Sequence, residues 1–286
     1  MRSHENFSIE ELIGKALFED LGEGGDITSK AVFDGSQKGR ALIKSKETGT
    51  LSGAFLVEPI FKALDPSIEI KRILQDGSKM ITGSEICSID GFLQSICAGE
   101  RLALNFLQRL SGIATATAKL AGLIAHTKAR ILDTRKTTPL LRRLEKRAVT
   151  HGGGMNHRFG LFDMVLIKDT HVKAAGGVAA ALTKARPVIA AMNKPMKIEV
   201  EVQTWDELLE ALPFAPDRIM LDNMSVATMT ACVQRVRMVA PSIELEASGN
   251  VDEKSIVAVA ETGVDFISVG AITHSVKALD IHLIIV

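Results

Sequence analysis

Charged or small residues stand at the ends of several short β-rich runs in the second half of the sequence. These run ends are Asp133, Lys168, Glu201, Asp222, Ser248 and Gly270. A single terminal carboxylate is more often a cap or a solvated strand end. Burying four ionisable ends close together is costly unless a ligand or counter-charge compensates. Their recurrence on successive runs therefore indicates a site rather than four unrelated surface positions.

Charges of opposite sign also segregate along this half of the chain. Residues 130–173 contain ten basic and four acidic side chains, whereas residues 197–222 contain seven acidic and two basic ones. Many of these side chains must be ordinary surface charge. The separation nevertheless predicts one pocket with two halves. The basic half would bind a polyanionic substrate, and the acidic half would face a divalent metal or a developing cation.

Glycines at three places support a site for anions. The triplet Gly152-Gly153-Gly154 precedes Asn156-His157-Arg158, and it predicts a flexible loop that delivers hydrogen-bond donors, although a plain loop explains the triplet alone equally well. Ser248-Gly249 and Gly270 follow consecutive β-rich runs. Backbone amides freed by small residues at the last two strands of a βα barrel commonly bind phosphate.

The elements that must position these residues follow a repeating pattern. The β-rich runs start roughly 20 to 35 residues apart, the length of a βα unit. They are Arg130–Asp133, Met164–Lys168, Lys197–Glu201, Arg218–Asp222, Ile243–Ala247 and Phe266–Gly270. Helix-compatible stretches lie between most of them. Consecutive βα units with right-handed crossovers predict a parallel sheet that closes toward a barrel.

The first part of the chain has a different pattern. Short strand-like runs at 41–44, 68–73 and 84–89 are separated by turn signals and predict a small mixed α and β domain. From residue 97 to about 113 the spacing becomes helical, with one apolar face and one polar stripe that includes Arg101. Spacing alone favours a solvent-facing role for this stripe. We expect the domain boundary at 107/108.

Composition excludes several classes of protein. The 286 residues are 46% apolar, and 34 basic side chains balance 34 acidic ones, so no overall attraction to nucleic acid or an anionic membrane is expected. Three cysteines without a CxxC pair fit a reducing cytosol. No signal peptide is apparent, and no apolar run approaches the roughly 20 residues that span a bilayer. We expect a soluble cytoplasmic protein.

Taken together, the motifs resemble those of the quinolinate phosphoribosyltransferases, also called nicotinate-nucleotide pyrophosphorylases (carboxylating). The resemblance covers nearly the whole chain, in the correct order. The matching segments are Gly24–Thr28, Gly99–Asn105, Ser111–Ala114, Asp133–Pro139, Glu145–Lys146, Ala148–Val149, Gly152–Gly154, Asn156–Arg158, Leu166–Asp169 with His171, Glu199–Glu201, Leu221–Asn223, Glu246–Gly249 and Ser268–Gly270. Three positions depart from the family pattern. Leu140 stands where glycine is usual, Arg147 where an aromatic residue is frequent, and Thr170 where asparagine is typical.

The resemblance implies an α/β fold in two domains. A small N-terminal α/β sandwich would span 1–107, and the tail 275–286 would pack with it. An open, seven-stranded, TIM-like α/β barrel would span 108–274. Family members work as homodimers, sometimes assembled further, in which Arg101 reaches the quinolinate of the neighbouring subunit. This implied role turns the polar stripe of the 97–113 helix into an interface.

The resemblance also implies the reaction. Phosphoribosyl pyrophosphate would transfer its phosphoribosyl group to quinolinate with decarboxylation, which gives nicotinate mononucleotide, pyrophosphate and CO2 for NAD biosynthesis. Lys136, Glu201 and Asp222 would be catalytic. Mg²⁺ would bind with the phosphoribosyl pyrophosphate near Glu201 and Asp222, directly or through water, and no organic cofactor is implied. The implied substrate-binding residues are Arg101, Thr134, Arg135, Lys136, His157, Arg158, Lys168, Glu201, Asp222, Ser248, Gly249 and Gly270.

Three alternatives remain open at this point. A relative with the same fold could use another acceptor, as the molybdenum-associated paralogues do. A phosphate-binding barrel aldolase or isomerase would use Lys168 to form a Schiff base with a carbonyl substrate. A barrel that only senses phosphorylated metabolites is compatible with any such fold, since fold alone does not fix function.

Overall fold

The computed structural model describes residues 8–192 and 195–286 and divides the chain into two compact units. The first unit comprises Met1–Thr115 and Val276–Val286, and the second comprises Ala116–Ser275. The division falls inside one long helix, α4 (Leu93–Leu123), as does the expected boundary at 107/108. Each unit has its own sheet and is described by itself.

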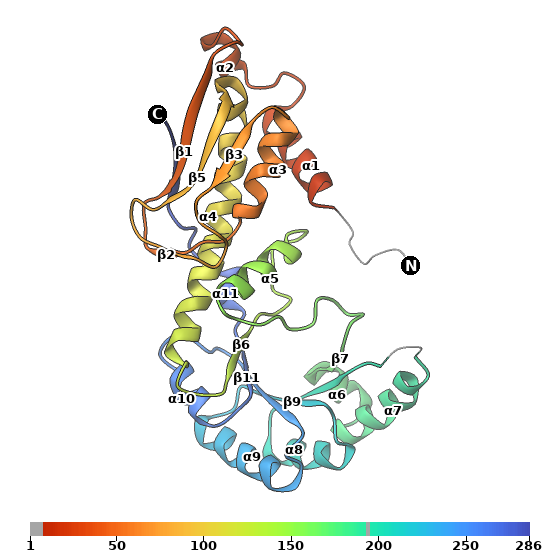
Figure 1. The fold of residues 1–286 in the computed structure, drawn as a ribbon. Helices are drawn as coiled ribbons and strands as arrows, with labels where there is room; N and C mark the ends of the chain where they lie inside the picture. Colours follow the sequence, from red (N-terminus) through yellow and green to blue (C-terminus); the bar gives the residue numbers. More distant parts are fainter. Residues whose placement is uncertain (1–7, 193–194) are drawn as a thin grey trace. The chain divides into compact units, whose positions relative to one another are not determined.

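The first unit contains a four-stranded antiparallel sheet in the order β12-β1-β5-β3 (Figure 1). Its strands are β1 (Lys38–Ser45), β3 (Glu69–Arg72), β5 (Glu85–Phe92) and β12 (Ile281–Ile285). Along β1, Ala41, Ile43 and Ser45 are buried and alternate with more exposed residues, because successive side chains of a strand point to opposite faces. One face of the sheet therefore forms the core of this unit.

Three short helices and a small ladder complete the first unit. The helices are α1 (Ile9–Leu21), α2 (Ile27–Val32) and α3 (Ala54–Leu64), and the ladder joins β2 (Gly49–Thr50) to β4 (Lys79–Met80). Helix α1 begins at a capping box, in which Ser8 and Glu11 satisfy each other's backbone N–H groups. The sheet, these helices and α4 form the α/β sandwich that the sequence predicts.

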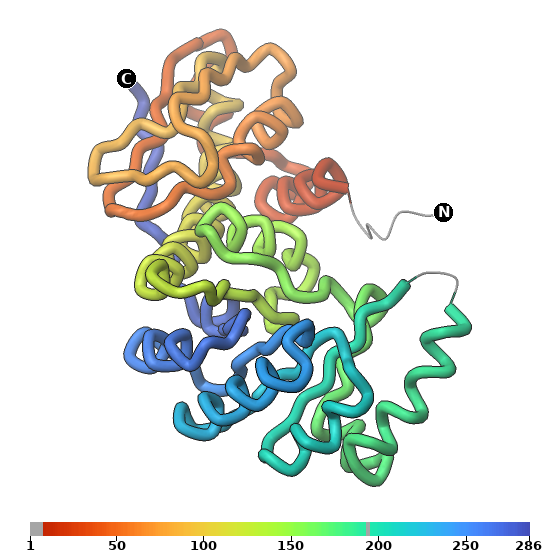
Figure 2. Tube along the Cα trace, turned by 60° about the horizontal axis from the view of Figure 1, so that its bottom comes forward, coloured from red at the N-terminus to blue at the C-terminus, as the bar shows by residue number. Residues whose placement is uncertain are grey.

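The second unit contains a six-stranded parallel sheet in the order β6-β11-β10-β9-β8-β7. Its strands are β6 (Arg130–Leu132), β7 (Val165–Ile167), β8 (Ile198–Val202), β9 (Arg218–Asp222), β10 (Glu244–Ser248) and β11 (Phe266–Ser268). The helices are α5 (Arg142–His151), α6 (Asp169–Ala175), α7 (Val178–Ala190), α8 (Trp205–Ala211), the short 3-10 helix η1 (Leu212–Phe214), α9 (Val226–Val239), α10 (Ile256–Glu261) and α11 (Ala271–His274). Figure 2 shows helices of this unit as an outer layer over the strands. The two-part α/β fold expected from the sequence is confirmed.

The barrel is open, and it differs from the expected seven strands in one respect. Met155 makes a single parallel bridge to Leu132 beside β6, so the seventh strand is reduced to one residue. At the opposite edge of the sheet, β8 is the only strand of the described residues that pairs with β7. The sheet therefore opens between Met155 and β7. Gly153, at φ 83°, turns the chain two residues before this bridge.

Strand β8 shows how this sheet carries polar groups into the barrel interior. Val200 and Val202 are fully buried on one face, as expected for a parallel strand covered by helices. Glu199 and Glu201 lie on the other face, and they too are buried, at 0% and 9% exposure. The alternation in the sequence therefore directs two carboxyl groups toward the inside of the barrel.

Within the described residues, no helix is long and apolar enough to cross a membrane, and this includes the 31-residue helix α4.

One loop of the second unit has an unfavourable backbone conformation. Leu140 has a φ of 68°, in the left-handed region that favours glycine and disfavours a residue with a branched side chain. Its side chain is 71% exposed, so burial offsets little of the strain. Asn223 and Asn250 also have positive φ, but asparagine tolerates this conformation better.

We predict that Leu140→Gly raises the free energy of unfolding by about 1 kcal/mol, because glycine removes the left-handed strain. Urea denaturation measures the change. Leu140→Ala is the matched control: it keeps a Cβ at the strained position, and its stability should stay within about 0.5 kcal/mol of the original. A Leu140→Gly variant that is less stable than the original protein would contradict the argument.

Candidate active site

A cavity of about 220 Å³ lies within the second unit, at the carboxyl ends of its parallel strands. Such ends share one edge of the sheet, which is where the sites of βα folds are built. Nine of the twelve residues that the resemblance assigned to substrate line this cavity, together with four others. The lining residues are Thr134, Arg135, Lys136, His157, Arg158, Leu166, Lys168, Glu201, Met220, Asp222, Glu246, Ser248 and Ser268.

The other three assigned residues do not line the cavity. Gly249 directly follows Ser248 and has a φ of 104°; a Cβ there would lie 2.2 Å from Oδ1 of Asn223, so the backbone passes too close for any side chain. A Cβ on Gly270 would lie 3.0 Å from Cδ of Lys136, so Gly270 adjoins a lining residue. Arg101 belongs to the first unit, where its side chain is 58% exposed. Its role at a neighbouring site stays a prediction.

Carboxylates form an acidic wall on one side of the cavity. Burial raises the pKa of Glu201 to about 7, and the nearby carboxylates of Asp222 and Asp169 add to this effect. Asp222 accepts hydrogen bonds from Asn223 Nδ2 at 2.7 Å and Gln203 Nε2 at 3.3 Å. Mutually repelling carboxylates are stabilised by a bound cation, and oxygen ligands suit Mg²⁺. Glu201 and Asp222 therefore fit the metal that the resemblance implies.

Basic side chains form the cationic part of the lining. Burial lowers the pKa of Arg158, and the positive charge of Arg135 lowers it further, so the two guanidinium groups lie close enough to repel. The Arg158 guanidinium also donates to the carbonyl of Met164 at 3.2 Å. An anion between these two cations would relieve the repulsion. This part of the cavity is therefore suited to a carboxylate or a phosphate.

A guanidinium outside the cavity holds the loop that carries Arg135. Arg142, at the start of α5, donates to Thr137 Oγ1 at 2.9 Å, to the carbonyl of Phe159 at 3.0 Å and to that of Arg135 at 3.3 Å. Three donors of one planar group thus tie two loops together. The position of Arg135 is therefore fixed by Arg142 as well as by the loop's own backbone.

A buried ion pair fixes the segment that carries His157 and Arg158. Asp133 is fully buried and accepts a short hydrogen bond from Nζ of Lys146, which is 3% exposed. Lys146 also donates to the His157 carbonyl at 2.9 Å, and the His157 backbone N–H donates to Asp133 at 2.8 Å. With its amide nitrogen toward Asp133, Asn156 donates there at 2.6 Å. The sequence analysis placed Asp133 among strand ends in the mouth; instead it lies beneath the cavity as a structural group.

Burial works against the charges of this pair. It raises the pKa of Asp133 and lowers that of Lys146, while each partner's charge opposes the shift of the other. Removing one partner leaves the other charge buried without compensation, which typically costs more than the pair contributes when intact.

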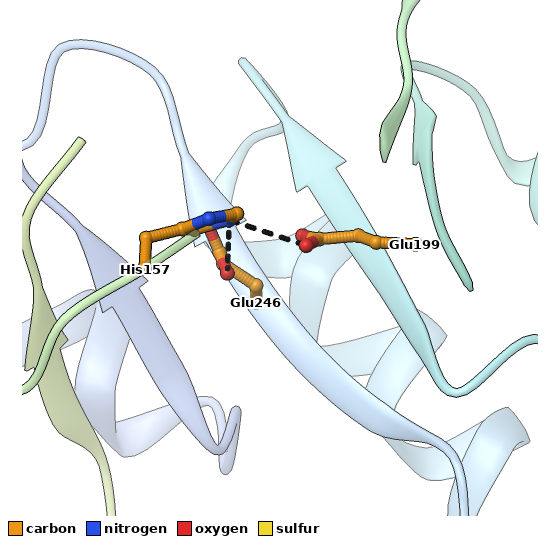
Figure 3. A group of neighbouring side chains, drawn as sticks. All are labelled: His157, Glu199 and Glu246. Atoms are coloured by element: carbon orange, nitrogen blue, oxygen red, sulfur yellow. Dashed lines mark ion pairs between the residues drawn. The ribbon is translucent and has the colours of Figure 1, made fainter. Parts of the chain in front are cut away.

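A second buried cluster lies on the inner face of the barrel. Nε2 of His157 is 3.1 Å from Glu199 Oε2 and 3.5 Å from Glu246 Oε2, and both carboxyl groups are fully buried (Figure 3). Arg218 NH1 is 2.9 Å from Glu246 Oε2 and 3.9 Å from Glu199 Oε2. Burial raises the pKa of each glutamate to about 7 and lowers that of His157. The sequence analysis quoted Glu199 and Glu246 in motifs but gave them no role.

Three of these side chains have the spacing of a metal site, since their ligand atoms lie within 4.8 Å of one another. The Arg218 guanidinium already supplies a positive charge to both carboxylates, so a divalent cation there would be repelled by it. The cluster is better described as a buried charge network that adjoins the cavity, whose lining includes His157 and Glu246.

The fold and the cavity together define an open βα-barrel protein with a site for a polyanionic ligand. Two family models cover most of the chain. The N-terminal domain of quinolinate phosphoribosyl transferase matches residues 26–111, and its C-terminal domain matches residues 113–284. The chain therefore belongs to the quinolinate phosphoribosyltransferase family.

Individual relatives agree with this assignment. The chain is 43% identical over 293 residues to quinolinate phosphoribosyltransferase [decarboxylating] 1 of Nicotiana glauca, covering 98% of this chain and 83% of the relative. It is 41% identical over 293 residues to the chloroplastic nicotinate-nucleotide pyrophosphorylase [carboxylating] of Arabidopsis thaliana, with 98% and 84% covered. The solved structure of the nicotinate-nucleotide pyrophosphorylase from Francisella tularensis superposes with a TM-score of 0.91 at 42% identity, with 97% and 96% covered.

We predict that Lys146→Met lowers the free energy of unfolding by about 3–5 kcal/mol, because it leaves Asp133 charged and buried without a counter-charge. Urea denaturation measures the loss. The double variant Asp133→Leu, Lys146→Met removes both charges and should lose less than the sum of the two single changes. If Lys146→Met unfolds within about 1 kcal/mol of the original protein, the pair does not hold this segment.

Proposed function

We propose that this protein transfers the phosphoribosyl group of phosphoribosyl pyrophosphate to quinolinate and releases CO2, with nicotinate mononucleotide and pyrophosphate as the other products. One observation carries the proposal: a single cavity is lined by basic side chains and by an acidic wall, next to strand ends with small residues. Membership of the quinolinate phosphoribosyltransferase family supports it.

Quinolinate would bind at the basic side of the cavity. It presents two carboxylates on a flat ring, and the planar guanidinium groups of Arg135 and Arg158 suit bidentate contact with them. Lys168 would add a compact charge. It stands directly after β7, and its backbone N–H donates to Nδ1 of His171 at 3.0 Å, which fixes the start of α6. A monocarboxylate would leave part of this positive charge without a partner.

The sugar phosphate would bind across the acidic wall and the small-residue strand ends. As pyrophosphate leaves, the ribose carbon gains positive charge, which the carboxylates of Glu201 and Asp222 would stabilise. The same two residues would hold Mg²⁺, directly or through water; when bound, it supplies charge that neutralises the pyrophosphate. Backbone amides at Ser248, Gly249 and Gly270 would receive the 5′-phosphate.

Lys136 would complete the phosphate side of the site. Its side chain lies against Gly270, and its own carbonyl accepts a hydrogen bond from Oγ1 of Thr273 at 2.7 Å. Its backbone N–H donates to Oγ1 of Thr134 at 3.0 Å. These contacts hold the Lys136 backbone and bring its side chain beside Gly270. From there its ammonium would stabilise the negative charge of the reacting phosphoribosyl pyrophosphate.

The decarboxylation needs no organic cofactor in this proposal. The ring nitrogen of quinolinate forms a bond to the ribose carbon and becomes a positive pyridinium. The bond from the ring to the adjacent carboxylate then breaks, CO2 leaves, and the pair of electrons stays on the ring carbon next to the positive nitrogen until a proton replaces it. The basic side chains bind and orient the second carboxylate, which remains in the product.

An assay of the purified protein tests the proposed function. With quinolinate, phosphoribosyl pyrophosphate and Mg²⁺ we expect nicotinate mononucleotide and CO2 in equal amounts. Nicotinate in place of quinolinate should give no product, because half of the anion recognition is unused. Equal rates with both acids, or no product from quinolinate, would contradict the proposal.

Arg135→Ala extends this test to a single contact. It should raise the KM for quinolinate and lower kcat/KM about 100-fold, since a charge-assisted bidentate contact is lost. Arg130→Ala, at the opposite end of β6 and outside the cavity lining, is a suitable control for the loss of one arginine.

We also propose that the active form is a homodimer in which Arg101 completes the site of the neighbouring subunit, with further assembly open. The exposure of the Arg101 side chain supports its availability to a partner. The three cysteines are free, which is compatible with a cytoplasmic protein. The balanced charge gives no reason to expect nucleic acid or membrane partners.

Mixing two inactive variants tests this shared site. Arg101→Ala and Lys168→Ala should each be nearly inactive alone. After the two are unfolded and refolded together, a mixed dimer contains one site with both residues intact. We expect about a quarter of the original activity, because half of the dimers are mixed and each has one working site. If the mixture stays inactive, Arg101 does not act across subunits.

A further inference from the structure

The imidazole of His157 has both of its ring nitrogens directed into the protein. Nδ1 accepts a hydrogen bond from the backbone N–H of Arg158 at 2.7 Å. An amide N–H can donate only to a ring nitrogen that carries no proton, so Nδ1 is unprotonated. In the neutral ring the hydrogen then resides on Nε2. The geometry around one nitrogen thus fixes the tautomer of the whole ring.

The second nitrogen faces the two buried glutamates, one on β8 and one on β10 (Figure 3). Nε2 of His157 is closer to Glu199 Oε2, at 3.1 Å, than Arg218 NH1 is, at 3.9 Å. Within the described residues, neither oxygen of Glu199 nor Nε2 of His157 has a partner with hydrogen-bond geometry, although Nε2 and Oε2 of Glu199 are only 3.1 Å apart. A buried carboxyl and a buried ring nitrogen are both costly without partners, and each is close enough to serve the other.

Arg218 on β9 fixes the place of these carboxyl groups. It donates through NH1 to Glu246 at 2.9 Å, and through Nε and NH2 to Glu244 at 3.3 and 3.0 Å. Its guanidinium carbon also lies 4.2 Å from the centre of the Phe266 ring, so a cation–π contact with this ring stabilises the group as well. Glu244 and Glu246 share this arginine, but only Glu246 lies within ion-pair distance of His157.

We propose that Glu199 and Glu246, anchored by Arg218, are positioning residues: they hold His157 in the tautomer with hydrogen on Nε2, and His157 in turn holds the backbone of Arg158 through Nδ1. The sequence assigned His157 to the group that binds substrate anions. In this arrangement His157 contributes a neutral wall, and the positive charge comes from Arg135, Arg158 and Lys168. The inference rests on the proposed function only in the role that Arg158 has toward a substrate carboxylate.

The environment of the ring agrees with a neutral imidazole. Burial lowers the pKa of His157, and the positive charges of Arg218, Lys146 and Arg158 lower it further, against the opposing effect of Glu246. A second proton on the ring would have to sit on Nδ1, where it would face the Arg158 N–H and break that hydrogen bond. A charged His157 would therefore remove one of the contacts that hold the backbone of Arg158.

Nitrogen NMR of ¹⁵N-histidine-labelled protein tests the tautomer without any assay of activity. The His157 signals are those that disappear in His157→Gln. We expect one protonated nitrogen, Nε2, in the original protein at pH 7, and a mixture of tautomers in Glu246→Gln and Glu199→Gln. An Nδ1–H or doubly protonated ring in the original protein would overturn the proposal, as would an unchanged tautomer in both variants.

Kinetics test the effect on substrate. Glu246→Gln should raise the KM for quinolinate about tenfold through misplacement of Arg158, while the KM for phosphoribosyl pyrophosphate changes less than about twofold. Glu244→Gln is the matched control, because it contacts the same arginine without touching His157, and its kinetics should be unchanged. Equal effects of the two variants, or none from Glu246→Gln, would refute the inference. If Glu246→Gln does not fold, Glu199→Gln replaces it.

The two hypotheses fail in different ways. If the original protein makes no product but its His157 carries hydrogen on Nε2 and the variants alter that state, the proposed function is wrong and the positioning network stands. If the original protein is active and the variants change neither the tautomer nor the KM for quinolinate, the network has no positioning role.

Discussion

The site depends on a pair of opposite charges that are buried below it. Asp133 and Lys146 bind each other and three groups of the segment 156–157, and they do so where a regular seventh strand would otherwise pair with β6. Backbone ladders usually position the residues at a strand end. Here the side chains of an ion pair replace the ladder, and they set the positions of His157 and Arg158.

Charge in the second unit is arranged in layers. Basic side chains and three carboxylates (Glu201, Asp222 and Glu246) line the cavity, and Glu246 also belongs to a more deeply buried network with Glu199 and Arg218. The groups of this network are buried, so water screens the electrostatic interactions between them only weakly. The upper layer has unbalanced charges of both signs, which is the condition for binding ligands of both signs. In the proposed function, the buried network keeps the side chains of the site in position, and the charged groups of the cavity lining bind the substrates.

Much of this arrangement follows from the sequence. Parallel strands share one edge, so the residues at the ends of β-rich runs could be placed together from the sequence. The alternation of charged and apolar residues in β8 likewise accounts for Glu199 and Glu201 sharing a face. The two-part fold also followed, mostly from the resemblance. The roles of individual residues toward substrate and metal remain predictions.

Other features have no local signal in the sequence. The seventh strand is reduced to Met155, and the segment that follows it is held by side-chain bonds between residues 13 to 24 positions apart. Arg218 meets Glu246 across 28 positions, and nothing in the β9 sequence distinguishes it from a solvent-facing arginine. The proposed tautomer of His157 depends on the Arg158 backbone at one ring nitrogen and on Glu199 and Glu246 at the other, a grouping that only coordinates reveal. Glu244 and Glu246 do alternate on β10 as the glutamates do on β8, and that repeat was the signal available for the buried network.

Strand β12 has a consequence for how the chain is made. It pairs along β1 from Ala41 to Ser45, and the paired residues are about 240 positions apart. During synthesis the ribosome releases β1 well before β12, so the sheet of the first unit keeps an open edge while the whole second unit emerges. An unpaired edge can join other chains, and closure over such a separation is slow. A nascent or truncated chain lacking those last residues should therefore be the form most prone to aggregate.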